Sequence, residues 1–376
     1  MTKRVITMLC TLLSFMACNR HIDIDIKGRL MENSASMIYL VVENSTVDTL
    51  ATAPIADDNS FHIQCRVTQP TTAFLCDDNG NALTMLLTEN TPLVLRPAEK
   101  GGYAVEGGPL NDKYNVIMRQ LSDLAEQIMH IDHNAETAEE EYESLMAKYH
   151  NALSTAITHN LDNIIGVELF IHQESHNMSP EDMQVRFAQF SQQMQALATM
   201  QEFEQYIAIL KRSQIGEPFI DVELQTITGE TTRLSEICGK GKWVLLDFWA
   251  TWCAPCVQEL PQLKVAYDRY ALMGFEICAI SLDPDIERLR EFVAQEQLLW
   301  KNMIDQASAD AAPASEVYGV TSIPTNFLIS PEGKIVARDL QGDDLIHQLQ
   351  HFIEGKDFCT FPQLHDDHTV TEEAVK

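Results

Sequence analysis

Two cysteines that are separated by two residues form the part of this sequence best suited to chemistry. Cys253 and Cys256 follow an apolar run, residues 243–248, and precede residues 257–260, which have the pattern of a helix start. The first turn of a helix exposes backbone N–H groups and the positive end of the helix dipole, which lower the pKa of a thiol there. A second thiol one turn later is placed to attack the mixed disulfide formed by the first. The spacing predicts dithiol–disulfide exchange, with Cys253 as the attacking thiolate at the exposed helix N-terminus and Cys256 as the buried resolving thiol.

Two other interpretations of the pair are half of a zinc site and two cysteines of the hydrophobic core. A zinc site needs a second pair of Cys or His ligands at comparable spacing. The histidine pairs His130/His133 and His365/His368 lie in polar segments that are typical of a protein surface. We therefore expect no metal and no other cofactor.

The pair lies within Trp-Ala-Thr-Trp-Cys-Ala-Pro-Cys, residues 249–256, which resembles the active site of thioredoxin-like proteins. The sequence is most similar to the TlpA/ResA branch of extracytoplasmic thiol–disulfide oxidoreductases, over roughly residues 215–354. The resemblance implies an α/β thioredoxin-like domain and protein-disulfide oxidoreductase activity. Strand–helix alternation in this region predicts parallel strands joined by crossover helices, followed by an antiparallel hairpin. The expected elements are strands 243–249, 275–282, 325–330 and 335–340 and helices 254–273, 285–296 and 343–354.

Two carboxyl groups are candidates to accept the proton that Cys256 must lose in an apolar place. Asp247 lies within an apolar strand, and Glu259 follows Cys256 by three residues on the same helix face. Asp247 matches the buried Asp of thioredoxin, and Glu259 matches the active-site Glu of TlpA/ResA-like proteins. Alternatively, Asp247 is a structural hydrogen-bonding group and Glu259 a solvated helix acid. We expect Asp247 to contribute more than Glu259.

The resemblance also implies residues that receive the substrate. In thioredoxin-like proteins the segment matching Ile323-Pro324 carries a cis proline beside the disulfide. Ile323 would offer its backbone to an extended substrate segment, in the manner of strand addition. Trp249 and Trp252 would pack around the cysteines and shape the docking surface, with core packing as the alternative.

The N-terminus has the pattern of a secretory signal. Lys3 and Arg4 precede the mostly apolar residues 5–17, a run too short to span a bilayer as a helix. Cys18 follows a small residue, which resembles a bacterial lipoprotein signal with Cys18 as the lipidated residue. The alternative is an ordinary cleaved signal. We expect a protein of the cell envelope or periplasm that a lipid anchors to a membrane.

The length of 376 residues suggests two or three domains, and the net charge of −29 argues against binding to nucleic acid. Alternating apolar residues predict six short strands between residues 22 and 96, and apolar spacing of three and four predicts helices after residue 111. The expected parts are a signal, residues 1–18; a β-rich domain forming a small β-sandwich, 19–108; a helical domain, 109–212; the thioredoxin-like domain, 213–356; and a tail, 357–376.

Cys65 and Cys76 flank the turn signal of residues 69–72 symmetrically. If these residues form a hairpin, the two cysteines face each other and can form a cross-strand disulfide. The other interpretation, which we favour, is two small buried apolar side chains without a bond.

Pro255 between the two active cysteines has no N–H group, so one potential donor to a thiolate is missing and the couple should be more reducing. We therefore expect a reductant of protein disulfides, whose partners are disulfide-bearing clients and a membrane thiol-relay protein that resupplies electrons; cytochrome c maturation is the best-known use in the family. One alternative is a disulfide-forming or isomerising oxidant. Another is a surface binding lipoprotein in which the dithiol matters less than the preceding domains.

Overall fold

The computed structural model describes residues 21–31, 35–43, 47–98, 101–132, 135, 137–306 and 312–355. The chain divides into two compact units, residues 1–204 and 205–376. The expected signal, Cys18, His133, His365, His368 and the expected tail lie outside the described residues. Among the described helices, none is both long and apolar enough to cross a membrane.

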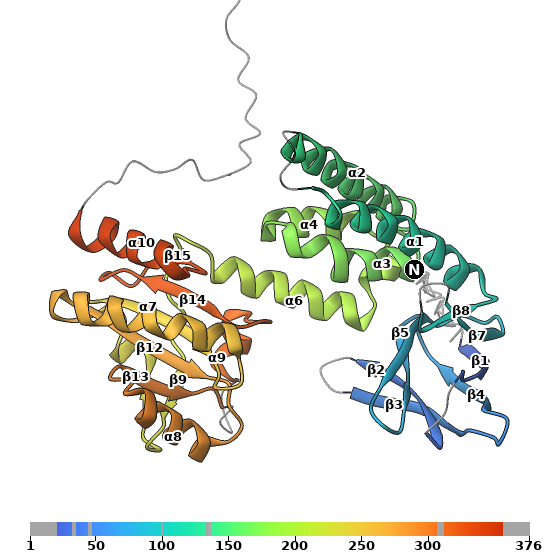
Figure 1. Cartoon of the computed structure of the whole chain (residues 1–376), viewed down its shortest axis with the longest axis horizontal. Helices are drawn as coiled ribbons and strands as arrows, with labels where there is room; N and C mark the ends of the chain where they lie inside the picture. The colour runs from blue at the N-terminus through green and yellow to red at the C-terminus, as the bar shows by residue number, and fades with distance from the viewer. Residues whose placement is uncertain are drawn as a thin grey trace, which may run out of the picture. The chain divides into compact units, whose positions relative to one another are not determined.

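The first unit contains the β-sandwich that the sequence predicts (Figure 1). Alternation explains its core, because Ile22, Ile24 and Ile26 are buried whereas Asp23 is exposed. One sheet has the order β4 (Ser60–Val67), β1 (Ile22–Arg29), β7 (Leu93–Pro97), β8 (Tyr103–Glu106). The other has the order β3 (Val47–Pro54), β2 (Met37–Glu43), β5 (Thr72–Asp77), β6 (Ala82–Leu87). Strands β3 and β8 were not among the six strands expected.

Residues 65–76 do not form a hairpin, and Cys65 and Cys76 are two partly buried side chains without a bond, the interpretation that we favoured. Cys65 lies on β4 opposite Ile24 of β1, and Cys76 lies on β5 opposite Tyr39 of β2. The turn at residues 69–72 therefore carries the chain from one sheet of the sandwich to the other instead of pairing its two flanks. Both thiols are free and half-buried.

Helices follow the sandwich in the same unit. They are α1 (Pro109–Met129), α2 (Ala138–Thr158), α3 (Ile164–Leu169), α4 (Pro180–Gln189), α5 (Gln192–Gln195) and α6 (Ala198–Arg212), and the division between the two units falls within α6. Ser179 caps α4, since its hydroxyl accepts from the Asp182 N–H at 3.1 Å.

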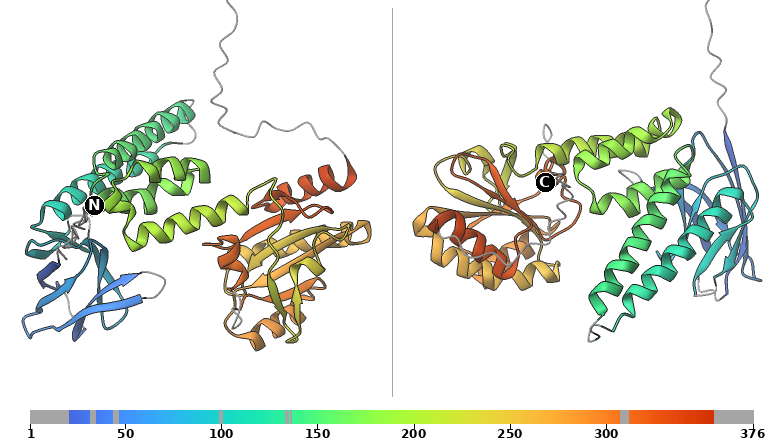
Figure 2. Two further views of the ribbon diagram at one scale, coloured as in Figure 1. Left: turned by 180° about the vertical axis from the view of Figure 1, so that it is seen from behind. Right: turned by 90° about the horizontal axis from the view of Figure 1, so that it is seen from above.

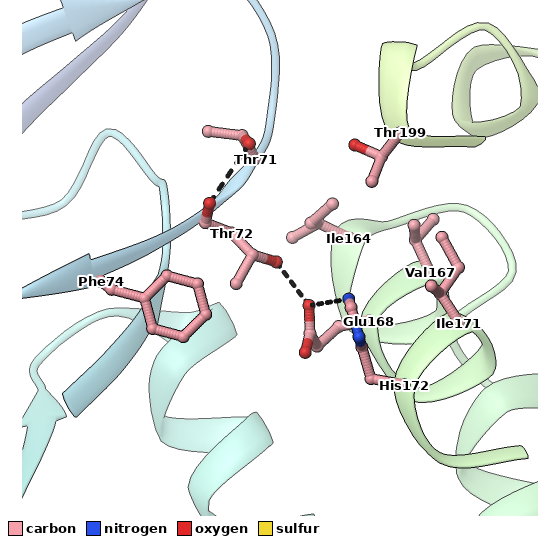
Figure 3. A pocket seen from close by; sticks show the side chains of 9 residues that line it. All are labelled: Thr71, Thr72, Phe74, Ile164, Val167, Glu168, Ile171, His172 and Thr199. Atoms are coloured by element: carbon pink, nitrogen blue, oxygen red, sulfur yellow. Dashed lines mark hydrogen bonds and ion pairs between the residues drawn. The ribbon is translucent and has the colours of Figure 1, made fainter. Parts of the chain in front are cut away.

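A small cavity of about 90 Å³ lies where the sandwich meets the helices (Figure 3). The Thr72 hydroxyl of β5 donates to Glu168 of α3 at 2.6 Å, and His172 lies 3.8 Å from the same carboxyl oxygen. Nearby, the buried Asn111 of α1 donates to the Leu87 carbonyl oxygen at 2.7 Å. These side-chain bonds connect the sandwich to the helices within the first unit.

The second unit contains a seven-stranded sheet with the order β10, β9, β13, β12, β11, β14, β15. Its strands are β9 (Glu223–Thr226), β10 (Thr231–Arg233), β11 (Trp243–Trp249), β12 (Phe275–Ser281), β13 (Lys301–Ile304), β14 (Thr325–Ile329) and β15 (Ile335–Arg338). Strands β11, β12 and β13 are parallel, and β14 and β15 form the predicted antiparallel hairpin. Strand β13 was not expected.

The helices of this unit are α7 (Ala254–Tyr270), α8 (Ile286–Glu296), α9 (Ala314–Tyr318) and α10 (Gly342–Glu354). Helices α7, α8 and α10 contribute to the core on one face of the sheet, and α9 contributes to the core on the other. Helices α7 and α10 lie side by side (Figure 2). This arrangement places the end of β11 and the start of α7 at the carboxyl edge of the parallel strands, where α/β folds build their sites.

Candidate active site

Cys253 and Cys256 lie where β11 ends and α7 begins, as the sequence predicts. Their sulfurs form a disulfide of 2.05 Å. Cys253 is the N-cap residue of α7, and its Sγ accepts from the Cys256 N–H at 3.2 Å. The Cys253 sulfur therefore occupies the place of a capping acceptor, where a negative charge is stabilised by the helix N-terminus.

The expectation that Cys253 is exposed is wrong for this disulfide form. Cys253 is 5% exposed and Cys256 3%. One reason is that the Ile323 carbonyl oxygen lies 3.7 Å from the Cys253 Sγ. The residues on either side of Cys253 reach solvent, since Trp252 is 57% exposed and Ala254 is exposed.

Ile323 and Pro324 are joined by a cis peptide bond, as the resemblance implies. They directly precede β14, which pairs antiparallel with β11 and so brings this loop beside the cysteines. The Thr325 hydroxyl donates to the Ser322 carbonyl oxygen at 2.8 Å, which closes the loop locally. A role for these residues in substrate binding stays a prediction.

The two tryptophans of the motif have different surroundings. Trp249 is 3% exposed and belongs to the same core as Cys253 and Cys256, with its ring 5.8 Å from that of Phe292. Trp252 projects into solvent and is available to shape a docking surface. Of the two, only Trp249 is explained by core packing.

Asp247 is buried in β11 at 6% exposure. Leu245 and Trp249, two residues to either side, belong to the core that contains both cysteines, so the alternation of the strand directs Asp247 to the same face. Burial first, and then the negative charge of Glu259, raise the pKa of Asp247 from 3.8 to about 7. A carboxyl group with this pKa exchanges a proton readily near neutral pH.

Glu259 is half-buried and holds the start of another helix. Its Oε2 accepts a hydrogen bond at 2.8 Å from the N–H of Gly342, which is the first residue of α10. Gly342 has a φ of +52°, a left-handed conformation that glycine adopts without strain. The side chain of the N-cap residue Gln341 makes no capping hydrogen bond, so Glu259 supplies this acceptor to α10. Glu259 is therefore not simply a solvated helix acid.

Sequence reasoning missed Thr251 and Asp283. The carboxyl group of Asp283, 5% exposed, accepts from the Thr251 N–H at 2.8 Å and from the Thr251 hydroxyl at 2.6 Å. Their positions in the sequence could have indicated this pair. Asp283 follows β12 and Thr251 follows β11, and the carboxyl ends of adjacent parallel strands meet at one edge of the sheet.

Among the described residues, no group of three or more His, Cys, Asp or Glu side chains is placed to hold a metal ion. The two sulfurs are instead bonded to each other. A reversible bond between an N-cap sulfur and a buried sulfur, on the face of the sheet that also carries an acid with its pKa raised to about 7, is suited to thiol–disulfide exchange.

Residues 215–338 match the AhpC/TSA family. The chain is 30% identical over 152 residues to the thiol-disulfide oxidoreductase ResA of Bacillus cereus, which covers 40% of this chain and 84% of the relative. It is 33% identical over 144 residues to the ResA of Oceanobacillus iheyensis, covering 37% of this chain and 71% of the relative. A solved thioredoxin domain of a thiol-disulfide oxidoreductase from Bacteroides vulgatus is 30% identical and covers 37% of this chain and 98% of that one, with a TM-score of 0.34.

The likeness to these relatives spans most of their length and is confined to a part of this chain. The geometry of Cys253 and Cys256 agrees with it. The chain therefore belongs to the ResA-like thiol-disulfide oxidoreductases of the AhpC/TSA thioredoxin fold, and it is a protein-disulfide oxidoreductase.

Proposed function

We propose that this oxidoreductase works outside the cytoplasm and reduces disulfide bonds in other proteins. The observation that carries the proposal is the disulfide at the N-terminus of α7 together with Asp247, whose pKa is raised to about 7. In the reduced protein the N-terminus of α7 stabilises the Cys253 thiolate, and Asp247 can accept a proton near neutral pH.

The reaction begins with the reduced dithiol. The Cys253 thiolate attacks one sulfur of a client disulfide, a mixed disulfide forms, and the other client sulfur leaves as a thiolate that takes a proton from water. Asp247 accepts the proton of Cys256, whose sulfur then attacks the Cys253 sulfur. The second client sulfur leaves as a thiol or thiolate, so the client gains two electrons and the enzyme ends with the Cys253–Cys256 bond.

The direction of electron flow is argued from the donors around the Cys253 sulfur. The Cys256 N–H donates to it, whereas Pro255 has no N–H to offer. A less stabilised thiolate makes a more reducing couple, so we expect a midpoint nearer to about −270 mV, as in thioredoxin, than to about −120 mV, as in DsbA. Equilibration of the protein with glutathione buffers measures it, and a value near the oxidising end would favour the disulfide-forming alternative.

We place the protein in the cell envelope, attached by a lipid at Cys18. The support is the charged and apolar N-terminal pattern, which lies outside the described residues. A reductant in an oxidising compartment needs electrons from elsewhere, which implies a membrane thiol-relay partner; cytochrome c maturation is one use of such a pair. Incorporation of labelled palmitate into the wild type, and its loss in Cys18→Ser, would test the anchor.

Clients can be identified by trapping. In Cys256→Ser the mixed disulfide cannot be resolved, so clients should remain bonded to Cys253, and mass spectrometry after reduction identifies them. The matched control is the double variant with Cys253→Ser, which should retain none. If the Cys253→Ser variant supports every activity of the wild type in cells, the dithiol is not the centre of the function, and the binding-lipoprotein alternative gains ground.

A further inference from the structure

The segment between β11 and α7 is tied to the end of the neighbouring strand β12. The Leu282 N–H donates to the Trp249 carbonyl oxygen at 2.9 Å. Two residues further along, both the backbone N–H and the hydroxyl of Thr251 donate to Asp283. Three hydrogen bonds therefore hold the stretch that leads directly into Cys253.

Asp283 is itself fixed. Its carboxyl group is buried, and a buried carboxyl group is costly unless hydrogen bonds satisfy it. The Ser281 hydroxyl donates to Asp283 Oδ2 at 2.7 Å, and the Asp283 N–H donates back to the Ser281 oxygen at 3.0 Å. Both carboxyl oxygens are thus occupied, and a fully satisfied polar network of this kind rigidifies its surroundings.

Thr251 transmits this rigidity to the cysteine. The Cys253 N–H donates to the Ala250 carbonyl oxygen at 3.2 Å, so Thr251 lies inside the tight turn that ends at Cys253. In the oxidised protein the bond to Cys256 also holds the Cys253 sulfur. Reduction removes that covalent restraint, and the position of the sulfur at the helix N-terminus then depends on the turn.

We propose that Asp283 is a positioning residue for the attacking thiolate and acts through Thr251, keeping the Cys253 sulfur aligned with the Cys256 N–H after the disulfide has opened. The inference rests on thiol–disulfide exchange at Cys253 and is independent of the proposed direction, clients and location. It predicts that loss of the Thr251–Asp283 link destabilises the thiolate.

A direct charge effect of Asp283 would act in the opposite direction. A negative carboxylate near a thiolate disfavours it, so removal of the charge alone would make the thiolate more stable. Asp283→Asn keeps the shape and an acceptor oxygen, whereas Asp283→Ala removes the link entirely. The other titratable groups of the site, Asp247 on β11 and Glu259 on α7, remain unchanged in both variants.

The test is alkylation of the reduced full-length protein by iodoacetamide between pH 5 and pH 10, with modification of Cys253 followed by mass spectrometry. In Thr251→Val, which loses only the hydroxyl, the pH midpoint should rise and the rate at pH 7 should fall roughly five-fold, the factor for one net hydrogen bond. Thr251→Ser should restore the wild-type profile. The rise of the midpoint in Asp283→Ala should equal or exceed the rise in Thr251→Val, and the rise in Asp283→Asn should be smaller. At high pH, where Cys253 is fully deprotonated, all variants should react at the wild-type rate.

Ser281→Ala is the comparison variant, because it removes both hydrogen bonds between the Ser281 hydroxyl and Asp283 and leaves the link to Thr251. It should lower the melting temperature and move the midpoint less than Thr251→Val does. Cys65, whose thiol pKa burial raises, provides a slow internal reference for alkylation. The proposal is overturned if the midpoint stays in place or falls in Asp283→Ala and Thr251→Val, or if Thr251→Ser behaves as Thr251→Val does. If Asp283→Ala does not fold, the pair of Thr251 variants decides.

Discussion

The charge of Glu259 acts on Asp247, but the two acids have different surroundings. Asp247 is enclosed by the core, and the charge of Glu259 helps to raise its pKa to about 7. Glu259 is occupied by the N–H of Gly342. This difference favours Asp247 as the proton acceptor for Cys256. Glu259 then acts as a charge, held in place by the Gly342 N–H, that raises the pKa of Asp247.

The first prediction concerns the rate at which the mixed disulfide is resolved. Asp247→Asn should slow this step by roughly 10²-fold, the lower range for loss of a general base, and Glu259→Gln should slow it less. In the wild type the rate should rise with pH through about 7, where Asp247 loses its proton, and this inflection should vanish in Asp247→Asn. Acid quenching after rapid mixing with a disulfide-bearing peptide measures the decay. Equal slowing in both variants would contradict the assignment.

A second prediction follows from the same raised pKa. The native state keeps the Asp247 proton over a pH range in which the unfolded chain, with its ordinary value of 3.8, has released it. The free energy of unfolding therefore falls as the pH rises from about 4 to about 7. Asp247→Asn has no carboxyl group at this position and should not show the loss. The difference in the free energy of unfolding between the variant and the wild type should therefore shift in favour of the variant by at most about 4 kcal/mol between those pH values. Urea unfolding at pH 4.5 and pH 8 tests this, and a gain that is equal at both would contradict it.

At the scale of single elements, the start of α10 depends on a residue of α7. Glu259→Ala leaves the Gly342 N–H without its acceptor, so we expect a loss of about 1 kcal/mol in the free energy of unfolding, comparable to the loss of a helix cap. Glu259→Gln retains a carbonyl oxygen and should lose less. Denaturant titration of both variants compares them, and an unchanged stability in Glu259→Ala would show that the bond contributes nothing.

The elements that the sequence predicts well are those with long apolar runs or clear caps. Strand β11 is confirmed residue for residue, and β12, α8 and α10 differ from expectation by a residue at one end. The sequence pattern did not predict strand β13, because the strand has only four residues and includes the buried polar Asn302. The pairing of Cys65 and Cys76 was left open for a different reason, since a local turn signal does not reveal whether the chain stays in one sheet.

The site shows the same limit. Both cysteines and the two acids were found from a motif and from their own apolar neighbours along the chain. Asp283 was not, because its partner Thr251 is 32 residues away and only the pairing of β11 with β12 brings them together. Hydrogen bonds between segments distant in sequence are decided by the fold as a whole.

At the scale of the whole molecule, the residues of the active site belong to the unit of residues 205–376. The last turns of α6 also belong to this unit, where Tyr206, Ile209 and Leu210 surround Gly319. The predicted boundary at residue 213 would remove these turns. The boundary at 205 keeps them.

We therefore expect fragments 205–355 and 213–355 to share the redox potential of the full chain but to differ in stability. The shorter fragment loses Ile207 and Leu210, which are buried, so it should melt at a lower temperature. Thermal unfolding followed by circular dichroism compares the two fragments, and glutathione equilibration gives their potentials. Equal melting temperatures would show that α6 adds nothing to this unit.

The burial of Cys253 under the Ile323 carbonyl has a consequence for the proteins that this enzyme can serve. A sulfur recessed in this way does not reach outward, so the incoming sulfur has to make the approach. A disulfide set deep in a rigid, folded partner has no such freedom, whereas one carried on a loose strand can be laid against the loop. If the sulfur stays recessed after reduction, we expect the enzyme to act on flexible or partly unfolded clients before rigid ones.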